Sequence, residues 1–197
     1  MTTFRWLALI PASLLLAFQL GAGADGSFIA LDGAAQPLKN AFNADVGKVR
    51  LLMYVSPTCG ECLRGAKQGQ QHVLATIGDP NLRIYVVWAP KNGGRQQDVG
   101  RVTQIVTDPR AAQYWDGHRV LTDAYDRMLA LSGPCAGILM LYGKQARWEG
   151  AGPPRADYLE DAHAEEFHRP YPQYDPQRFA EKARELLTST WSATSAP

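Results

Sequence analysis

Residues 49–62 have the sequence Val-Arg-Leu-Leu-Met-Tyr-Val-Ser-Pro-Thr-Cys-Gly-Glu-Cys, an apolar run followed by two cysteines three positions apart. The apolar run predicts a central strand that is covered on both faces. The spacing of apolar residues over 60–77 predicts a helix, so Cys59 and Cys62 lie at a strand-to-helix junction. Unpaired N–H groups at the start of that helix favour thiolate, the nucleophile of disulfide exchange. The two cysteines are therefore the candidate redox pair.

The composition indicates one domain with a substantial core. The chain has 197 residues, of which 46% are hydrophobic and 20% are charged. The formal net charge is +1, so we expect no nucleic-acid partner. The sequence has only three cysteines, Cys59, Cys62 and Cys135, too few for a disulfide-stapled scaffold. A glycine-rich phosphate-binding loop is not visible in the sequence, and we expect no organic cofactor or nucleotide.

The first 24 residues have the pattern of an export signal. Arg5 supplies a positive start, residues 6–20 are mostly apolar, and the small residues 22–24 form a cleavage site before Asp25. The apolar stretch is shorter than the roughly 20 residues that a membrane span needs, although an uncleaved N-terminal anchor remains the alternative. Export would place the thiols in an oxidising compartment, periplasmic or extracellular.

The rest of the chain alternates strand and helix patterns. We expect an irregular lead-in with one short strand over 25–47, a polar surface segment over 150–173 and a loose tail over 191–197. Further strands are predicted at 82–88, at 137–142, and at 145–149 in a hairpin with the preceding strand. Further helices are predicted at 96–106, from Pro109, at 120–129 and after the capping residue Asp175.

This order of elements resembles the thioredoxin fold, an α/β fold with a mixed central sheet flanked by helices. The resemblance covers residues 48–190 and includes an enlarged helical insert before the third core strand. The chain is similar to exported thiol-disulfide oxidoreductases. This similarity implies that Cys59 attacks a substrate disulfide and Cys62 resolves the mixed disulfide. It also implies a protein substrate with thiols or a disulfide, and electrons from a membrane-bound donor or another thiol protein.

The sequence departs from the thioredoxin pattern around the cysteines. Thioredoxins usually carry Trp before the first cysteine and Gly-Pro between the two, where this chain has Thr58 and Gly60-Glu61. The Glu61 carboxylate opposes the helix field and should make the pair more reducing. The family has a cis-proline before the third strand, and Pro134 is the candidate for that role. Cys135 would then lie near Cys59, as a buried small hydrophobe, a third redox thiol or a metal ligand.

Candidates for a substrate groove come from the sheet edge that carries the cysteines. Parallel strands present their carboxyl ends at one edge, where ligands bind in open α/β sheets. Trp88 and Pro90 end the second predicted strand there, although Trp88 is equally well explained as a core aromatic. Together with these two residues, the groove candidates are Thr58, Glu61 and Cys135.

Two other functions remain open. The same thiols, with Cys135 or a histidine, could hold copper or zinc in a metal-binding or delivery module. The domain could also be a non-catalytic accessory subunit. We assign no residue as a metal ligand, and the five-residue spacing of His163 and His168 does not match a zinc-protease motif. We expect all four side chains in solvent: His72, His118, His163 and His168.

Overall fold

The computed structural model describes residues 27–190. The predicted signal sequence at 1–24 and the tail at 191–197 lie outside the described residues. Within them, no helix is both long and apolar enough to cross a membrane.

The described residues form a mixed sheet whose strand order is β1-β4-β3-β2-β5-β6. Strand β2 is central, with β3 parallel on one side and β5 antiparallel on the other. Strands β4 and β1 extend the parallel side, and β6 extends the antiparallel side. The strands are β1 (Ile29–Ala30), β2 (Val49–Val55), β3 (Leu82–Trp88), β4 (Ala111–Trp115), β5 (Gly137–Tyr142) and β6 (Tyr158–Asp161).

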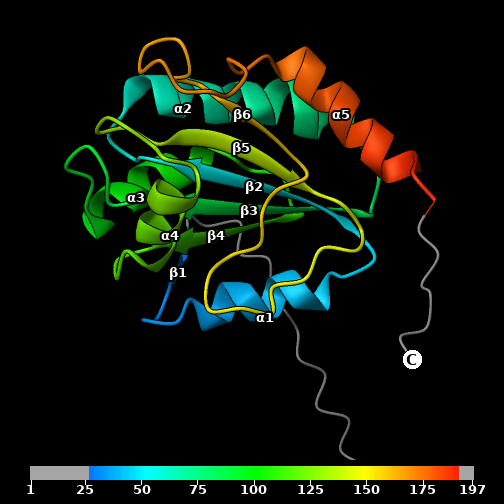
Figure 1. Cartoon of the computed structure of the whole chain (residues 1–197), viewed down its shortest axis with the longest axis horizontal. Coiled ribbons are helices and arrows are strands. Elements are labelled where there is room, and N and C mark those ends of the chain that lie inside the picture. Colours follow the sequence, from blue (N-terminus) through cyan, green and yellow to red (C-terminus); the bar gives the residue numbers. More distant parts are fainter. Residues whose placement is uncertain (1–26, 191–197) are drawn as a thin grey trace, which may run out of the picture.

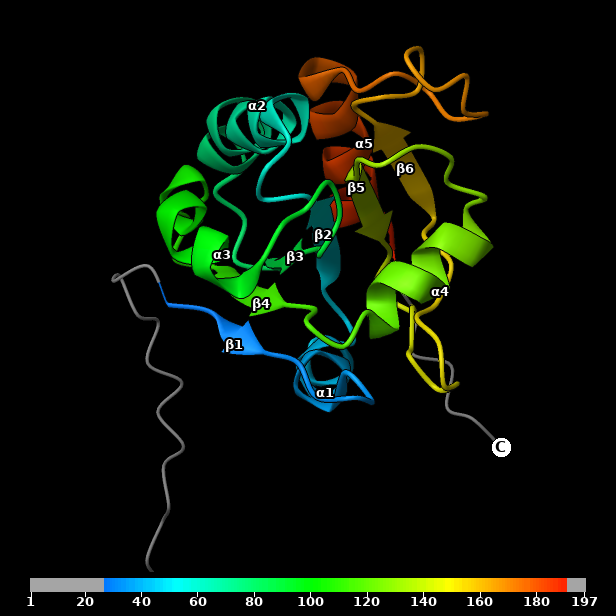
Figure 2. The same ribbon diagram turned by 90° about the vertical axis from the view of Figure 1, so that its left-hand side faces the viewer.

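Helices cover both faces of this sheet, as Figures 1 and 2 show. The residues of α2, α3 and α5 pack against one face, and those of α1 and α4 pack against the other. The helices are α1 (Gln36–Ala44), α2 (Gly60–Gln68), α3 (Gln96–Val102), α4 (Val120–Met128) and α5 (Pro176–Thr188).

Strand β2 lies between two apolar layers, as its sequence predicted. All seven of its residues are buried. Leu51 and Met53 belong to the core beneath α2, and Leu52 and Tyr54 belong to the core above α1, because successive side chains point to opposite faces. The cysteines therefore directly follow a strand that is buried on both faces.

The helix after β2 confirms the prediction for residues 60–77. Helix α2 continues through a π-helical turn at Gly69–Val73 and a 3-10 turn at Leu74–Thr76. A Cβ atom on Gly69 would lie 2.8 Å from Met53 Cε, so this glycine allows the helix to approach the sheet closely. Asp175 caps α5 as expected, accepting hydrogen bonds from the backbone of Gln177 and Arg178.

Three predicted elements need correction. The lead-in is not irregular, because it contains α1 as well as β1. The insert between β3 and β5 is not only helical, because residues 111–115 form β4, paired with β3. Residues 145–149 form no strand. Trp148 turns instead toward α1, where its backbone N–H donates to Asn43 Oδ1 at 2.8 Å, and β6 takes the place beside β5.

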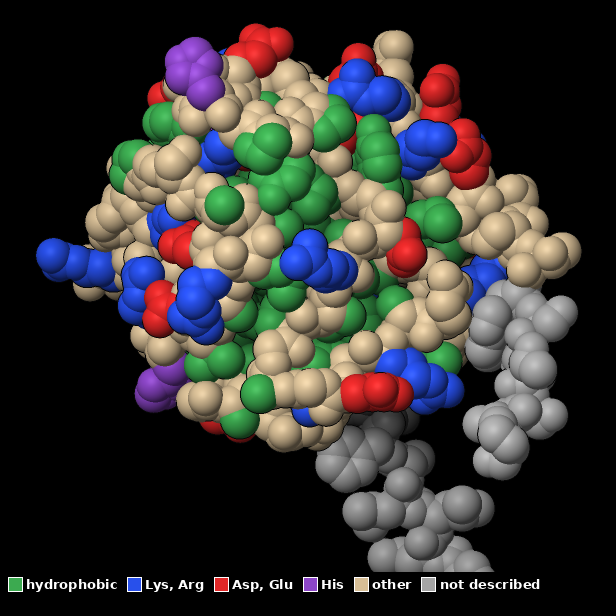
Figure 3. All heavy atoms as spheres, in the orientation of Figure 1, with side chains coloured by type: hydrophobic (Ala, Val, Ile, Leu, Met, Phe, Trp, Pro, Cys, Tyr) green, Lys and Arg blue, Asp and Glu red, His purple; other side chains and the backbone are tan. Residues whose placement is uncertain are grey.

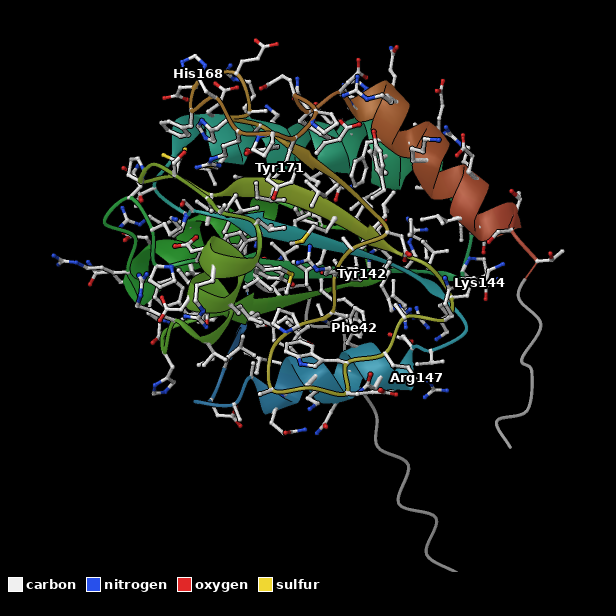
Figure 4. The ribbon with its side chains drawn as sticks, viewed as in Figure 1. Phe42, Tyr142, Lys144, Arg147, His168 and Tyr171 are labelled. Atoms are coloured by element: carbon white, nitrogen blue, oxygen red, sulfur yellow. The ribbon has the colours of Figure 1, made fainter. Side chains whose placement is uncertain are left out.

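An aromatic and cationic cluster fixes α1 on the sheet. Phe42 and Tyr142 meet edge to face, with ring centroids 5.0 Å apart, and lie between the sheet and α1 in Figure 4. The buried Arg50 guanidinium lies 4.6 Å from the Phe42 ring centroid.

On the outer surface of the face shown in Figure 3, acidic and basic side chains are interspersed.

Candidate functional site

The cysteine pair lies at the carboxyl end of β2 and the start of α2. Cys59 is the N-cap residue of α2, and its Sγ accepts a hydrogen bond from the Cys62 backbone N–H at 3.4 Å. Both residues carry free thiols, with exposed fractions of 4% for Cys59 and 1% for Cys62. The helix start thus directs its N–H groups at the Cys59 sulfur, as the sequence predicted.

A histidine contacts both sulfurs. His163 Nε2 lies 3.3 Å from Cys59 Sγ and 3.1 Å from Cys62 Sγ. The prediction that this side chain lies in solvent was wrong, because His163 is only 2% exposed. It follows β6, and the chain after β6 folds back over the start of α2. The other three histidines, His72, His118 and His168, are exposed as expected.

Three neighbours hold the His163 ring in place. The Glu166 carboxylate lies 2.5 Å from His163 Nδ1, which turns Nε2 toward the thiols. The His163 backbone N–H donates to Asp161 Oδ1 at 2.8 Å. The Phe167 ring stacks on the imidazole with centroids 5.2 Å apart. The ring nitrogen that faces the cysteines is therefore fixed by contacts on its opposite side.

A buried ion pair links this histidine segment to the loop before β5. Arg169 Nη1 donates to Asp161 Oδ2 at 2.9 Å, and both side chains are almost completely buried. The same guanidinium donates to the carbonyl oxygens of Ser132 and Cys135. Arg169 thus connects the segment of His163, through Asp161, to the backbone of Cys135.

Cys135 completes a cluster of four buried side chains. Its Sγ, the sulfurs of Cys59 and Cys62, and a ring nitrogen of His163 all lie within 4.8 Å of one another. Cys135 is 9% exposed. The expectation that it lies near Cys59 is confirmed.

The electrostatics of the cluster disfavour several thiolates at once. Burial, followed by the hydrogen bond and charge of Cys59, raises the pKa of Cys62 far above its usual range. Burial and the same neighbour raise the pKa of Cys135 to about 11. In the absence of a cation, Cys62 and Cys135 therefore remain protonated at neutral pH.

Pro134 precedes Cys135 and is exposed. The described residues contain no cis peptide bond, so the bond before Pro134 is trans, unlike that of the thioredoxin cis-proline. The proline nevertheless occupies the expected place, at the entry to β5 beside the thiol cluster.

The other predicted groove residues are dispersed. Thr58 is exposed and its Oγ1 donates to the Asn92 carbonyl at 2.8 Å. Glu61 pairs with Arg64 at 2.8 Å, which partly compensates its charge. Trp88 is fully buried in the core with Cys59, so the core interpretation of this residue is the one that the structure bears out. Pro90 is half-buried.

The sequence alone did not identify His163 or the residues that hold it, which are Asp161, Glu166 and Arg169. The only local signal was the three-residue spacing from His163 to Glu166, within a segment rich in charge. The cysteines lie 104 and 101 positions earlier in the chain, so their contact with His163 depends on the fold.

Comparison with known proteins gives likenesses of structure only. No family model and no curated protein matches this sequence. The Mycobacterium tuberculosis protein DsbF is 10% identical, with a TM-score of 0.47 over 73% of this chain and 84% of its own. A secreted M. tuberculosis disulfide oxidoreductase homologous to E. coli DsbE is 14% identical, with a TM-score of 0.43 over 73% of this chain and 85% of its own. The thioredoxin domain of a Bacteroides vulgatus thiol-disulfide oxidoreductase is 14% identical, with a TM-score of 0.41 over 53% of this chain and 69% of its own.

The fold itself follows from the strand directions. Strands β2 and β3 are parallel and connected through α2. Strand β5 runs antiparallel beside β2, β6 pairs antiparallel with β5, and α5 packs on the face that α2 covers. The cysteine pair starts the first of these helices. The chain therefore has a thioredoxin-like fold.

Proposed function

We propose that this chain is an exported protein that exchanges thiols and disulfides with protein substrates. The observation that carries the proposal is the pair of free thiols at the start of α2, both in contact with one imidazole nitrogen. A thiol pair at a helix start can be oxidised and reduced in turn, because the helix field and a nearby base assist thiolate formation.

The exchange proceeds in two steps. The Cys59 thiolate attacks one sulfur of a substrate disulfide, forming a mixed disulfide and releasing the other sulfur as a thiolate. Cys62 then gives up its proton and attacks Cys59 Sγ, which releases the second substrate thiolate and leaves a Cys59–Cys62 disulfide. Two electrons pass from the cysteine pair to the substrate, and the reverse sequence oxidises a dithiol.

His163 is positioned to move the protons of both steps. Its Nε2 is close enough to exchange a proton with either sulfur, and Glu166 on Nδ1 stabilises the imidazolium that forms. The raised pKa of Cys62 makes this assistance necessary, because a buried neutral thiol is a poor nucleophile.

Exposed residues flank the buried thiols and provide the contact with a substrate. Thr58 and Gly60 adjoin Cys59 in sequence, and Pro134 adjoins Cys135. An extended peptide crossing this rim would bring its disulfide to Cys59, the more exposed of the cysteine pair. We therefore expect a protein substrate.

Export rests on the N-terminal sequence. The signal-like residues 1–24 would deliver the domain to a periplasmic or extracellular compartment, where a membrane-bound donor or another thiol protein could supply electrons. The mass of the secreted protein should correspond to a chain that begins at Asp25. A mass that includes residues 1–24 would instead support an anchor.

The reduction potential of the cysteine pair in metal-free protein tests the exchange. We expect a reversible two-electron couple within about −120 to −270 mV, the range of known exchange proteins.

Cys62→Ser should trap a mixed disulfide with a peptide disulfide substrate, detected by mass, because the resolving thiol is missing. The matched Cys59→Ser protein should trap none. A pair that resists dithiothreitol while folded would contradict the proposal and favour a non-catalytic accessory role.

A further inference from the structure

We propose that the reduced protein binds one zinc ion, held by the sulfurs of Cys59, Cys62 and Cys135 and by Nε2 of His163. The inference goes beyond the proposed exchange reaction, although it shares two thiols with it. The four donors come from three parts of the chain: the start of α2, the loop before β5 and the segment after β6.

The geometry of the donors is suited to a tetrahedral ion. Zinc bonds of about 2.3 Å to sulfur and about 2.0 Å to nitrogen place tetrahedral donors roughly 3.5–3.8 Å apart. The four donor atoms lie within 4.8 Å of one another, and His163 Nε2 lies 3.1 and 3.3 Å from two of the sulfurs. Small rearrangements of side chains are therefore enough to surround an ion.

The second layer of contacts is the one that metal-binding histidines use. A ligating imidazole usually donates its other N–H to a carboxylate, a backbone carbonyl or water, and the Glu166 carboxylate lies 2.5 Å from His163 Nδ1. Asp161 holds the His163 backbone, and Arg169 holds both Asp161 and the Cys135 carbonyl. These contacts place His163 and Cys135 without depending on an ion.

Donor chemistry indicates the class of cation that would bind. Three sulfurs in one buried cluster would carry several negative charges if ionised, and a divalent ion compensates them because coordination deprotonates thiols. Three sulfurs and one imidazole favour zinc over calcium or magnesium, which prefer oxygen ligands.

Zinc binding and the Cys59–Cys62 disulfide exclude each other. A substrate disulfide that reacts with the two bound thiolates gains two electrons and leaves as two thiolates, while Cys59 and Cys62 become a disulfide. Zinc then retains at most Cys135 and His163 and is released. The redox state of the pair would thus determine whether the metal is held.

Metal titration of the full chain tests the site. Reduced protein, stripped with a chelator under argon, is titrated with Co²⁺ and then with Zn²⁺ against a chromophoric competitor. We expect one ion per chain, with the thiolate-to-cobalt absorption and visible bands of a tetrahedral site. Oxidised protein should bind at least tenfold more weakly.

Single substitutions identify the ligands. Cys135→Ser and His163→Ala should each weaken zinc binding at least tenfold, and Glu166→Gln about 10–100-fold. His168→Asn is the matched control, because His168 lies on the same segment but is exposed, at the outer loop in Figure 4. It should bind zinc as tightly as the natural protein.

A rescue variant separates ligation from folding. His163→Cys would supply a fourth thiolate, so it should retain zinc and shift the cobalt spectrum toward that of four sulfurs. Undiminished zinc affinity in Cys135→Ser or His163→Ala would overturn the four-ligand site, as would equal binding by oxidised protein. A reversible redox couple without zinc binding would overturn this inference alone, and zinc binding without a reversible couple would overturn only the exchange proposal.

Discussion

Gly137 allows His163 to reach the cysteines. A Cβ atom at this position would lie 3.1 Å from Ala162 Cβ, 3.4 Å from Cys62 Cα and 3.4 Å from His163 Cδ2. Strand β5, helix α2 and the segment after β6 therefore meet around a residue that has no side chain. The contact between sulfur and imidazole depends on this close approach.

Gly137→Ala should disturb the site as well as the fold. Overpacking a dense region costs about 1–3 kcal/mol, and the added methyl group would move His163 away from Cys62. We expect a lower free energy of unfolding in urea and slower disulfide exchange. Gly78→Ala is the control, because nothing lies within 4 Å of its added Cβ atom. Equal stability and exchange rates in the two variants would contradict this account.

At the scale of elements, Arg50 joins β2 to α1. Its Nη1 donates to the carbonyl oxygens of Phe42 at 3.4 Å and Asp45 at 3.3 Å, at the carboxyl end of the helix. Its Nη2 donates to the Gly143 carbonyl after β5. One buried cation thereby satisfies three backbone groups from two separate segments.

Arg50→Met should destabilise the protein by about 2–4 kcal/mol, because buried carbonyls lose their partners. Arg83→Met offers a comparison, since Arg83 lies opposite Arg50 on β3 but is partly exposed and pairs with Asp45 at 3.2 Å. This second change should cost less than about 1 kcal/mol. Urea denaturation of both proteins measures the difference, and similar losses would show that burial of Arg50 is not decisive.

The elements that the sequence did not predict have physical explanations. Helix α1 follows Ala35 in a left-handed conformation (φ 51°), with no side-chain N-cap; Asp32 instead accepts from the Gln36 N–H at 2.8 Å. Strand β6 looks like a surface segment because it ends in two acidic residues. Its buried Glu160 and Asp161 pair with Arg178 and Arg169 respectively. Such pairs form between distant segments, whereas β2, β3 and β5 were predictable from their own apolar residues.

For the whole molecule, acid stability should depend on Asp45. Burial raises the pKa of this carboxyl, but hydrogen bonds from Lys48 and Tyr85 and the charges of Lys48 and Arg83 outweigh burial and lower it below 3.8. A lowered folded-state pKa contributes stability that is present above the unfolded value and is lost as the pH falls through the folded value. This carboxylate connects the end of α1 to β3.

Asp45→Asn should therefore be less stable than the natural protein near neutral pH. The difference in unfolding free energy should shrink as the pH falls below about 4, the usual aspartate range. Urea denaturation between pH 3 and pH 7 measures it. A difference that stays constant over this interval would show that the charge of Asp45 is not what stabilises the junction.

The site was predictable to the extent that it is local. The sequence places Cys59 and Cys62 at a helix start and Cys135 beside them, and the structure agrees. The contact of His163 with the cysteines was missed because it depends on the pairing of β6 with β5, which the sequence did not predict. Glu166 and Asp161 contact His163, and Arg169 pairs with Asp161, but none of these three residues lies near the cysteines in sequence.

The order of the donors along the chain has a consequence for biosynthesis. Cys59 and Cys62 precede His163 by 104 and 101 positions, so they leave the ribosome before the segment that covers them. Until that segment docks beside β5, a newly made chain presents two uncovered thiols to any oxidant in its surroundings. Protection of these thiols from alkylation would therefore report when the segment around His163 has docked.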